Sequence, residues 1–320
     1  YVFIDIMKLI YYISFEGNGF LSLDYAFNGL EVFEMSDSKR FEIADITVRI
    51  PQVDWSKGFS RRWNNGNAVR THVFNALSFL FPQGERFFID VAREVASGID
   101  FSKNRGLEKA VKGFIAQESV HSQQHDQYNE VLQQQGFQNV AHDSIIRLQK
   151  QSKRHFSLLS RLAIVCAYEH YTAILGNFIL SNPRILELAE PSMALVWGWH
   201  CAEETEHKAV CFDLYRAAGG GWIKRMSIFW VVTLSFSIMF SRNYFSLLWR
   251  DGCMKPSRMA KTLGQSLKFF FGSSGVAWHI IIHGFRYLMY SFHPWNQDNR
   301  NKLEAWLSVN HKQLRTSGGR

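Results

Sequence analysis

Two copies of a four-residue pattern, Glu-x-x-His, carry residue types that bind metals. They pair Glu118 with His121 and Glu204 with His207. Side chains three residues apart lie on the same face of a helix, so each pair can direct a carboxylate and an imidazole toward one point. Oxygen and nitrogen ligands of this kind suit Fe and Mn. The pattern therefore predicts a metal site built from two helices.

The apolar periodicity around these pairs indicates that they face a protein core. Spacings of three and four residues connect both pairs to apolar positions. The two stripes are Leu107, Val111, Phe114, Glu118, His121, His125, Tyr128 and Leu132, and then Trp197, His200, Glu204, His207, Cys211 and Leu214. A buried carboxylate without a partner costs several kcal/mol. Because no Lys or Arg lies on these stripes, metal coordination is favoured over a structural ion pair.

Single glutamates on two other helical segments complete a ligand set. Glu85 lies in the stretch GERFF, and Glu169 takes an apolar position on a third stripe. Glu85 precedes Glu118 by 33 residues and Glu169 precedes Glu204 by 35, as two hairpins joined by one long crossover would produce. Four glutamates and two histidines in this order are the ligands of ferritin-like di-iron and di-manganese bundles. The predicted metal ligands are Glu85, Glu118, His121, Glu169, Glu204 and His207. The predicted cofactor is two Fe, alternatively two Mn, per chain.

Two histidines on the same stripes, His125 and His200, lie outside this ligand set. On antiparallel helices both fall about 8 Å to the same side of the metals, at 1.5 Å per residue. We predict that they face one another and are catalytic, as added nitrogen ligands or as a proton relay. The alternative is two unrelated polar residues in a wet part of the core. Glu203 is placed to support His207 from one turn away, and Glu206 is expected on a solvated face.

Four long helical patterns between residues 68 and 218 position these side chains. The first breaks near Pro82, the second ends at Gly136, the third covers roughly 155–180, and the fourth begins near Pro191. The link of about twenty residues between the second and third is the longest connection. The predicted fold class is all-α: a ferritin-like four-helix bundle with one long crossover over 68–218. An aromatic, basic helical C-terminal extension follows over 219–320, residues 35–67 lead into the bundle, and 1–34 form an uncertain N-terminal extension.

The net charge of +8 is concentrated in one segment. Residues 222–290 contain nine Lys or Arg and one acid, Asp251, and they are rich in aromatic residues. Its apolar runs at 226–240 and 276–290 suit either helices packed against the bundle or a monotopic or re-entrant contact with an anionic membrane. No nucleic-acid motif accompanies them, so nucleic acid is not an expected partner. Four cysteines without a CxxC pair predict reduced thiols and a cytoplasmic location, with the inner face of the membrane as a candidate association.

At the proposed ligands the chain resembles the bacterial family of predicted metal-dependent hydrolases. The matching stretches are FPQGERFF, FIAQESVHSQQHDQYN, AYEHYTA, WHCAEETEHKAVCFDLY and YSFHPWNQDN. The resemblance spans roughly residues 40–305 and implies a metal enzyme. The residues that it carries over are Glu85, Glu118, His121, His125, Glu169, His200, Glu204 and His207.

The ligand set favours one chemistry and leaves two alternatives open. Carboxylate-bridged Fe or Mn favours O2-dependent oxidation of an apolar small molecule, with an unknown electron donor. Hydrolysis of an ester-like substrate is the first alternative, since two metals can generate hydroxide and polarise a carbonyl. A non-catalytic metal-binding bundle is the second. The sequence contains no Ser–His–Asp pattern, phosphate loop or dinucleotide fingerprint, so other enzyme classes lack support.

Overall fold

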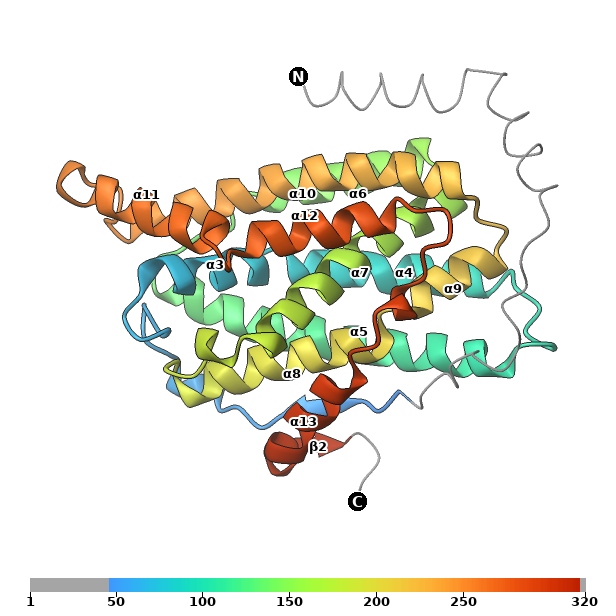
Figure 1. The fold of residues 1–320 in the computed structure, drawn as a ribbon, viewed down its shortest axis with the longest axis horizontal. Helices are drawn as coiled ribbons and strands as arrows, with labels where there is room; N and C mark the ends of the chain where they lie inside the picture. Colours follow the sequence, from blue (N-terminus) through green and yellow to red (C-terminus); the bar gives the residue numbers. More distant parts are fainter. Residues whose placement is uncertain (1–45, 317–320) are drawn as a thin grey trace.

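The computed structural model describes residues 46–316, and the fold is all-α as the sequence predicts (Figure 1). The predicted N-terminal extension and the first part of the lead-in lie outside the described residues. The helices are α3 (Ala68–Ser78), α4 (Phe81–Ala96), α5 (Arg105–Gln134), α6 (His142–His155), α7 (Leu158–Ser181), α8 (Pro191–His207), α9 (Val210–Ala217), α10 (Trp222–Arg250), α11 (Pro256–Phe271), α12 (Val276–Tyr287) and α13 (Arg300–Asn310). Two short strands, β1 (Arg49–Pro51) and β2 (Leu314–Thr316), pair antiparallel with Arg49 opposite Thr316.

Local sequence signals account for where the bundle helices begin and end. Asn67 and Asn104 cap α3 and α5 by accepting hydrogen bonds from backbone amides of their first turns. Pro82 lies in the first turn of α4, where a missing amide hydrogen is tolerated. Gly136, just beyond α5, has a φ of 85°, a left-handed conformation that glycine adopts without strain.

Four elements pack side by side around one core, namely α4, α5, α7 and the α8–α9 pair. Helix α4 packs on α5 and α7, and the α8–α9 pair closes the arrangement against the other sides of α5 and α7. Buried apolar side chains from each element fill the interior, among them Phe88, Phe114, Leu162 and Leu214. The interior of the arrangement is therefore continuous between the helices that carry the predicted ligands.

Two features differ from the predicted elements. The link between the second and third helices is itself a helix, α6, which carries the chain back along the molecule (Figure 1). Its sequence is mostly polar, with Ile145 as its buried apolar residue. The fourth predicted helix is interrupted after His207, where α8 ends, and it resumes as α9. At the interruption Lys208 Nζ donates to the Gln297 carbonyl (2.7 Å) and to Asn299 Oδ1 (2.6 Å).

The C-terminal extension forms a second layer on the bundle. Helix α10 packs along α7 and α3, and α12 packs along α7 and α11. Within residues 46–316, two helices, α7 and α10, are long and apolar enough to cross a membrane by length and composition. Because most of α7 is buried inside the protein, its apolar character is explained by the core, whereas α10 is buried over a smaller share of its length.

Candidate metal centre

The six predicted ligands lie together in the buried middle of the bundle. Helix α4 supplies Glu85, α5 supplies Glu118 and His121, α7 supplies Glu169, and α8 supplies Glu204 and His207. None of the six residues is more than 3% exposed. Both Glu-x-x-His pairs therefore lie on helix faces that point into the core, as the apolar periodicity around them predicts.

The two histidines approach the same carboxylates. His207 Nε2 lies 3.2 Å from Glu118 Oε1, 3.5 Å from Glu169 Oε2 and 3.5 Å from Glu204 Oε2. His121 Nδ1 lies 3.6 Å from Glu118 Oε1 and 3.5 Å from Glu204 Oε1. Glu118 and Glu204 are therefore close to both histidines and occupy the middle of the cluster.

The cluster leaves many buried polar atoms without hydrogen bonds, which is the condition that a metal would satisfy. Among residues 46–316, the unpartnered atoms include both carboxylate oxygens of Glu85, Glu118 and Glu169, Glu204 Oε2, His121 Nδ1, His200 Nε2 and His207 Nε2. Buried polar groups are otherwise almost always hydrogen-bonded. Several groups of three such atoms lie within 4.8 Å of one another, a spacing that allows them to hold an ion. The residues present thus fit a metal site with mixed oxygen and nitrogen ligands.

Burial and mutual repulsion control the charges of the carboxylates. Burial, together with neighbouring Glu118, raises the pKa of Glu85 well above its usual value, and burial beside Glu204 does the same to the pKa of Glu169. Burial would also raise the pKa of Glu204, but His207 and His121 hold it well below its usual range. Metal cations would replace the protons that Glu85 and Glu169 otherwise retain.

The outer nitrogens of both ligand histidines have partners of their own. His121 Nε2 lies 3.0 Å from Glu203 Oε2, and His207 Nδ1 lies 2.8 Å from Gln117 Oε1. The prediction that Glu203 supports His207 is wrong. One residue before Glu204 the helix turns by about 100°, which directs Glu203 across to α5 and His121.

Arg49 of β1 connects Glu203 and Gln117, the residues that hold the outer nitrogens of the two histidines. Its backbone amide donates to Glu203 Oε1 (3.0 Å), and its guanidinium forms two hydrogen bonds with Glu206, of 2.9 and 3.0 Å. Gln117 Nε2 also donates to Glu206 Oε2 (2.6 Å). Glu206 is therefore covered by Arg49 and does not lie on a solvated face as expected. Neither Arg49 nor Gln117 belongs to the Glu-x-x-His pattern, so the sequence offered no signal for them.

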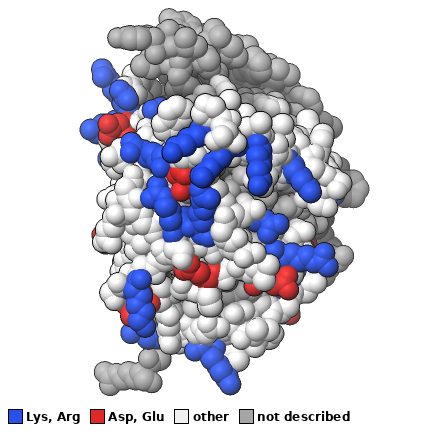
Figure 2. Space-filling view, turned by 90° about the vertical axis from the view of Figure 1, so that its left-hand side faces the viewer, with Lys and Arg blue, Asp and Glu red and all other residues white. Residues whose placement is uncertain are grey.

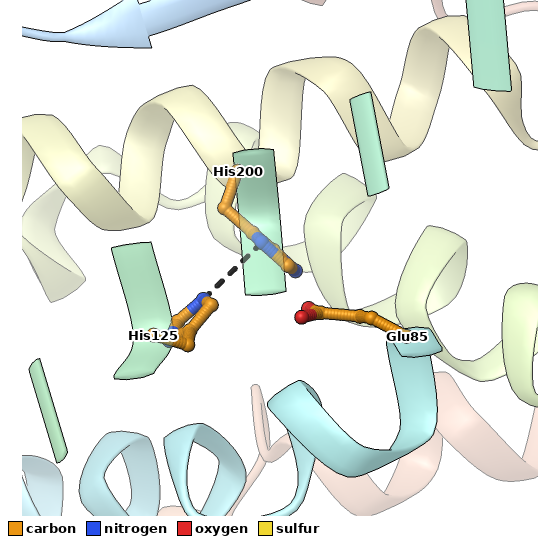
Figure 3. A group of neighbouring side chains, drawn as sticks. All are labelled: Glu85, His125 and His200. Carbon is orange, nitrogen blue, oxygen red and sulfur yellow. Dashed lines mark hydrogen bonds between the residues drawn. The ribbon is translucent and has the colours of Figure 1, made fainter. Parts of the chain in front are cut away.

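His125 and His200 lie next to each other beside the cluster (Figure 3). His125 Nε2 and His200 Nδ1 are 3.3 Å apart, and Glu85 points toward the pair from α4. His200 Nε2 lies 3.4 Å from Glu204 Oε1, whereas His125 Nδ1 lies 2.9 Å from Ser78 Oγ. Burial lowers the pKa of His200 to about 3, so its imidazole is neutral. The structure brings both residues to the same side of the cluster, and their catalytic role stays a prediction.

An apolar cavity reaches the cluster from one side. It has a volume of about 110 Å³, and its walls come from α4, α6, α7 and α10. Most of the lining is aliphatic or aromatic, and its charged members are Glu85 and Glu204. The arrangement can therefore bring an uncharged, apolar molecule to two of the proposed metal ligands.

Comparison with known proteins gives one match. A family model described as "predicted metal-dependent hydrolase" matches residues 47–298, which include every proposed ligand. No curated protein and no solved structure matches the chain.

Proposed function

Because the chain belongs to the family of predicted metal-dependent hydrolases, we propose that it is an enzyme that holds two Fe or Mn ions and oxidises an apolar small molecule with O2. The proposed ligands are Glu85, Glu118, His121, Glu169, Glu204 and His207. Two such ions would supply the electron-transfer chemistry that O2 requires, with electrons from an external donor. The observation that carries the proposal is the apolar cavity, because it leads to the unpartnered carboxylates of Glu85 and Glu204.

The residues of this chain have separable tasks in such a reaction. The apolar cavity walls exclude water and orient the substrate toward the cluster. Glu203 and Gln117 fix the ring orientations of His121 and His207 through their outer nitrogens. His125 and His200 form a hydrogen-bonded pair that can relay a proton beside the cluster. Ser78 Oγ donates to Asn129 Oδ1 and therefore accepts from His125 Nδ1 on the far side of the pair.

Hydrolysis at the same site is the second candidate, and the family description favours it. Two metals can polarise an ester carbonyl and generate hydroxide. Among residues 46–316, the cavity lining contains no Lys or Arg to bind a charged leaving group, which favours an uncharged ester as a hydrolytic substrate. A non-catalytic bundle is less favoured, because metal storage does not need an apolar cavity leading to the ligands.

Oxygen uptake separates oxidation from hydrolysis. Protein loaded with Fe and reduced without air is mixed with O2 and a series of alcohols and alkanes of increasing length. We expect O2 consumption that depends on the apolar compound, with oxygen-18 from O2 appearing in the product. The control is the Glu118→Ala/Glu204→Ala variant, which we expect to lack metal and to consume no O2. Cleavage of uncharged esters under nitrogen, at a rate that O2 does not change, would establish hydrolysis instead.

A further inference from the structure

The outer surface of α10–α12 exposes a large number of apolar side chains. Large contiguous patches of exposed apolar side chains mark interaction sites on soluble proteins. The large exposed apolar residues of these helices and the turn after α12 are Trp230, Leu234, Ile238, Phe245, Trp249, Met259, Leu267, Phe271, Trp278, Ile281, Ile282, Phe285, Met289 and Tyr290. Elsewhere in the described chain, only Leu188 and Val309 are large apolar residues with similar exposure.

On α10 the exposed residues form a stripe that points away from the bundle. The side of α10 that packs on α7 contains Phe229, which stacks on Tyr171, and Thr233, whose hydroxyl lies 2.7 Å from that of Tyr171. At about 100° per residue, the exposed residues Leu234 and Ile238 lie on the other side of the helix. Burial within the bundle therefore does not account for this stripe.

Helix α12 has the same arrangement. Its inner side contacts α7 through His279, 3.2 Å from Asn177 Nδ2, and through the His283 carbonyl, 3.1 Å from His170 Nε2. The exposed residues Trp278 and Phe285 lie on the opposite side of the helix. Helices α10 and α12 lie side by side in the outer layer of the molecule (Figure 1), and each has exposed apolar residues on its outer side.

Basic side chains accompany this apolar surface. Residues 222–290 contain nine Lys or Arg and one acid, Asp251. That carboxylate is already bound by Arg61 (2.9 Å), Arg62 (2.6 Å) and His72 (3.0 Å). Figure 2 shows Lys and Arg side chains gathered over the end of the molecule where α11 lies, with few acids among them. The exposed cations of the segment are Arg242, Arg250, Lys255, Arg258, Lys261, Lys268 and Arg286.

We propose that the docking face, meaning the exposed apolar and basic side chains of α10–α12, binds an anionic lipid bilayer. Trp and Tyr favour the boundary between lipid and water, and cations beside them attract anionic headgroups. Each Lys or Arg near such a surface strengthens partitioning roughly five-fold. A second copy of the chain is a poorer partner, because a two-fold interface would bring like charges against one another.

The position of α10 connects the docking face to the cavity. Its inner side lines the cavity with Val231, Val232, Ser235, Phe236 and Met239, while its outer side belongs to the docking face. An apolar compound dissolved in the bilayer would therefore reach the cavity beside a docked helix. This route rests on the proposed function, whereas docking itself does not.

Vesicle sedimentation of the metal-loaded full chain tests docking. We expect the protein to pellet with vesicles of phosphatidylcholine and phosphatidylglycerol, to bind phosphatidylcholine alone far less, and to be released as salt rises. Replacing Lys255, Arg258 and Lys261 with Gln should weaken binding on the order of 100-fold. The matched control replaces Lys57, Lys103 and Lys312, exposed lysines outside the segment, and should leave binding unchanged.

A second pair of variants tests how much the exposed apolar side chains contribute to vesicle binding. Trp278→Ser with Phe285→Ser should reduce binding to anionic vesicles, whereas Leu188→Ser with Val309→Ser, equally exposed elsewhere, should not. Equal binding of wild type and the Trp278→Ser/Phe285→Ser variant, or equal binding to neutral and anionic vesicles, would overturn the proposal.

A crosslinking experiment identifies the occupant of the face. The native cysteines are all buried, so a photo-crosslinker attached at Trp278→Cys reports on this surface. Capture of lipid supports the proposal. Capture of residues 1–45 of the same chain, or of a second copy, would overturn it by showing that protein covers the face. Metal content, measured on the same samples, tests the proposed function separately, because none of these substitutions lies at the cluster.

Discussion

His121 and Glu203 lie 3.0 Å apart, and this contact decides which ring nitrogen of His121 faces the cluster. Because a carboxylate accepts, Nε2 carries a hydrogen, and Nδ1 is the nitrogen that faces Glu118 and Glu204 and would bind a metal. His207 has the reverse arrangement, since Nδ1 donates to Gln117 Oε1 and Nε2 faces inward. The two proposed ligand histidines therefore turn opposite ring nitrogens toward the cluster, and each is held by a partner from the facing helix.

Removing this support should weaken metal binding without removing a ligand. We expect Glu203→Ala to lower metal affinity about 10- to 100-fold, because His121 loses the partner that fixes its tautomer and orientation. Competition against a chelator of known affinity measures the change. Glu203→Gln keeps an acceptor oxygen and should recover part of the loss. The control is Glu187→Ala on the exposed surface. An unchanged affinity in Glu203→Ala would show that the contact is only structural.

The central carboxylates should affect metal content far more than folding. We expect Glu118→Ala/Glu204→Ala to remove bound metal in elemental analysis. Without metal, the variant should be about as stable as the metal-free wild type, because it relieves the repulsion that Glu118 and Glu204 exert on the buried carboxylates of Glu85 and Glu169. Added metal should raise the melting temperature of the wild type and leave that of the variant unchanged. Full metal occupancy in the variant would contradict the ligand assignment.

The sequence predicts that these carboxylates and imidazoles lie together, because helical spacing alone determines which side chains share a buried face. Glu118 and His121 are three residues apart, so any α-helix there brings them together. The supports from Arg49 and Gln117 depend on contacts between elements far apart in sequence, 154 residues in the case of Arg49 and Glu203. Periodicity carries no information on such contacts. For the same reason Glu203 was assigned to the histidine on its own helix.

Asp251 should contribute stability that is lost in acid. Its carboxylate binds Arg61, Arg62 and His72, and although burial alone would raise its pKa, these partners hold it well below the usual range. A lowered folded-state pKa stabilises the fold above the unfolded value of about 3.9, and this stability disappears as the pH falls toward the folded value. We expect Asp251→Asn to lose about 2 kcal/mol at pH 7 in urea unfolding.

The difference between Asp251→Asn and wild type should shrink as the pH falls below about 4. Asp298→Asn is the control, since its ion pair with Arg300 is largely exposed. A pH-independent difference would show that the carboxylate charge is not the cause. Metal content should not change in either variant.

If substrates enter through the cavity, a larger side chain on α10 should weaken substrate binding only where it faces the cavity. Met239 lines the cavity, while the adjacent Ile238 faces solvent. We expect Met239→Trp to raise the KM for long apolar substrates roughly ten-fold or more, because overpacking costs about 1–3 kcal/mol. Short substrates and metal content should be affected less. Ile238→Trp is the matched control and should behave like wild type with soluble substrates. Equal effects of the two substitutions would argue against a substrate path through this cavity.

Substitutions of His125 and His200 should have different effects, although the two side chains are hydrogen-bonded to each other. His200 Nε2 has no hydrogen-bond partner among residues 46–316 and lies 3.4 Å from Glu204, so His200→Ala should lower metal affinity. His125 is one step further away, held between His200 and Ser78. We therefore expect His125→Ala to keep its metal and to lose about 10²- to 10⁴-fold in turnover, the usual contribution of a proton-transferring group. Ser78→Ala, which removes the outer contact of His125 together with the hydrogen bond from Ser78 to Asn129, should show a smaller loss. Metal analysis and single-turnover rates on the three variants check this order, and wild-type metal content and turnover in both histidine variants would refute it.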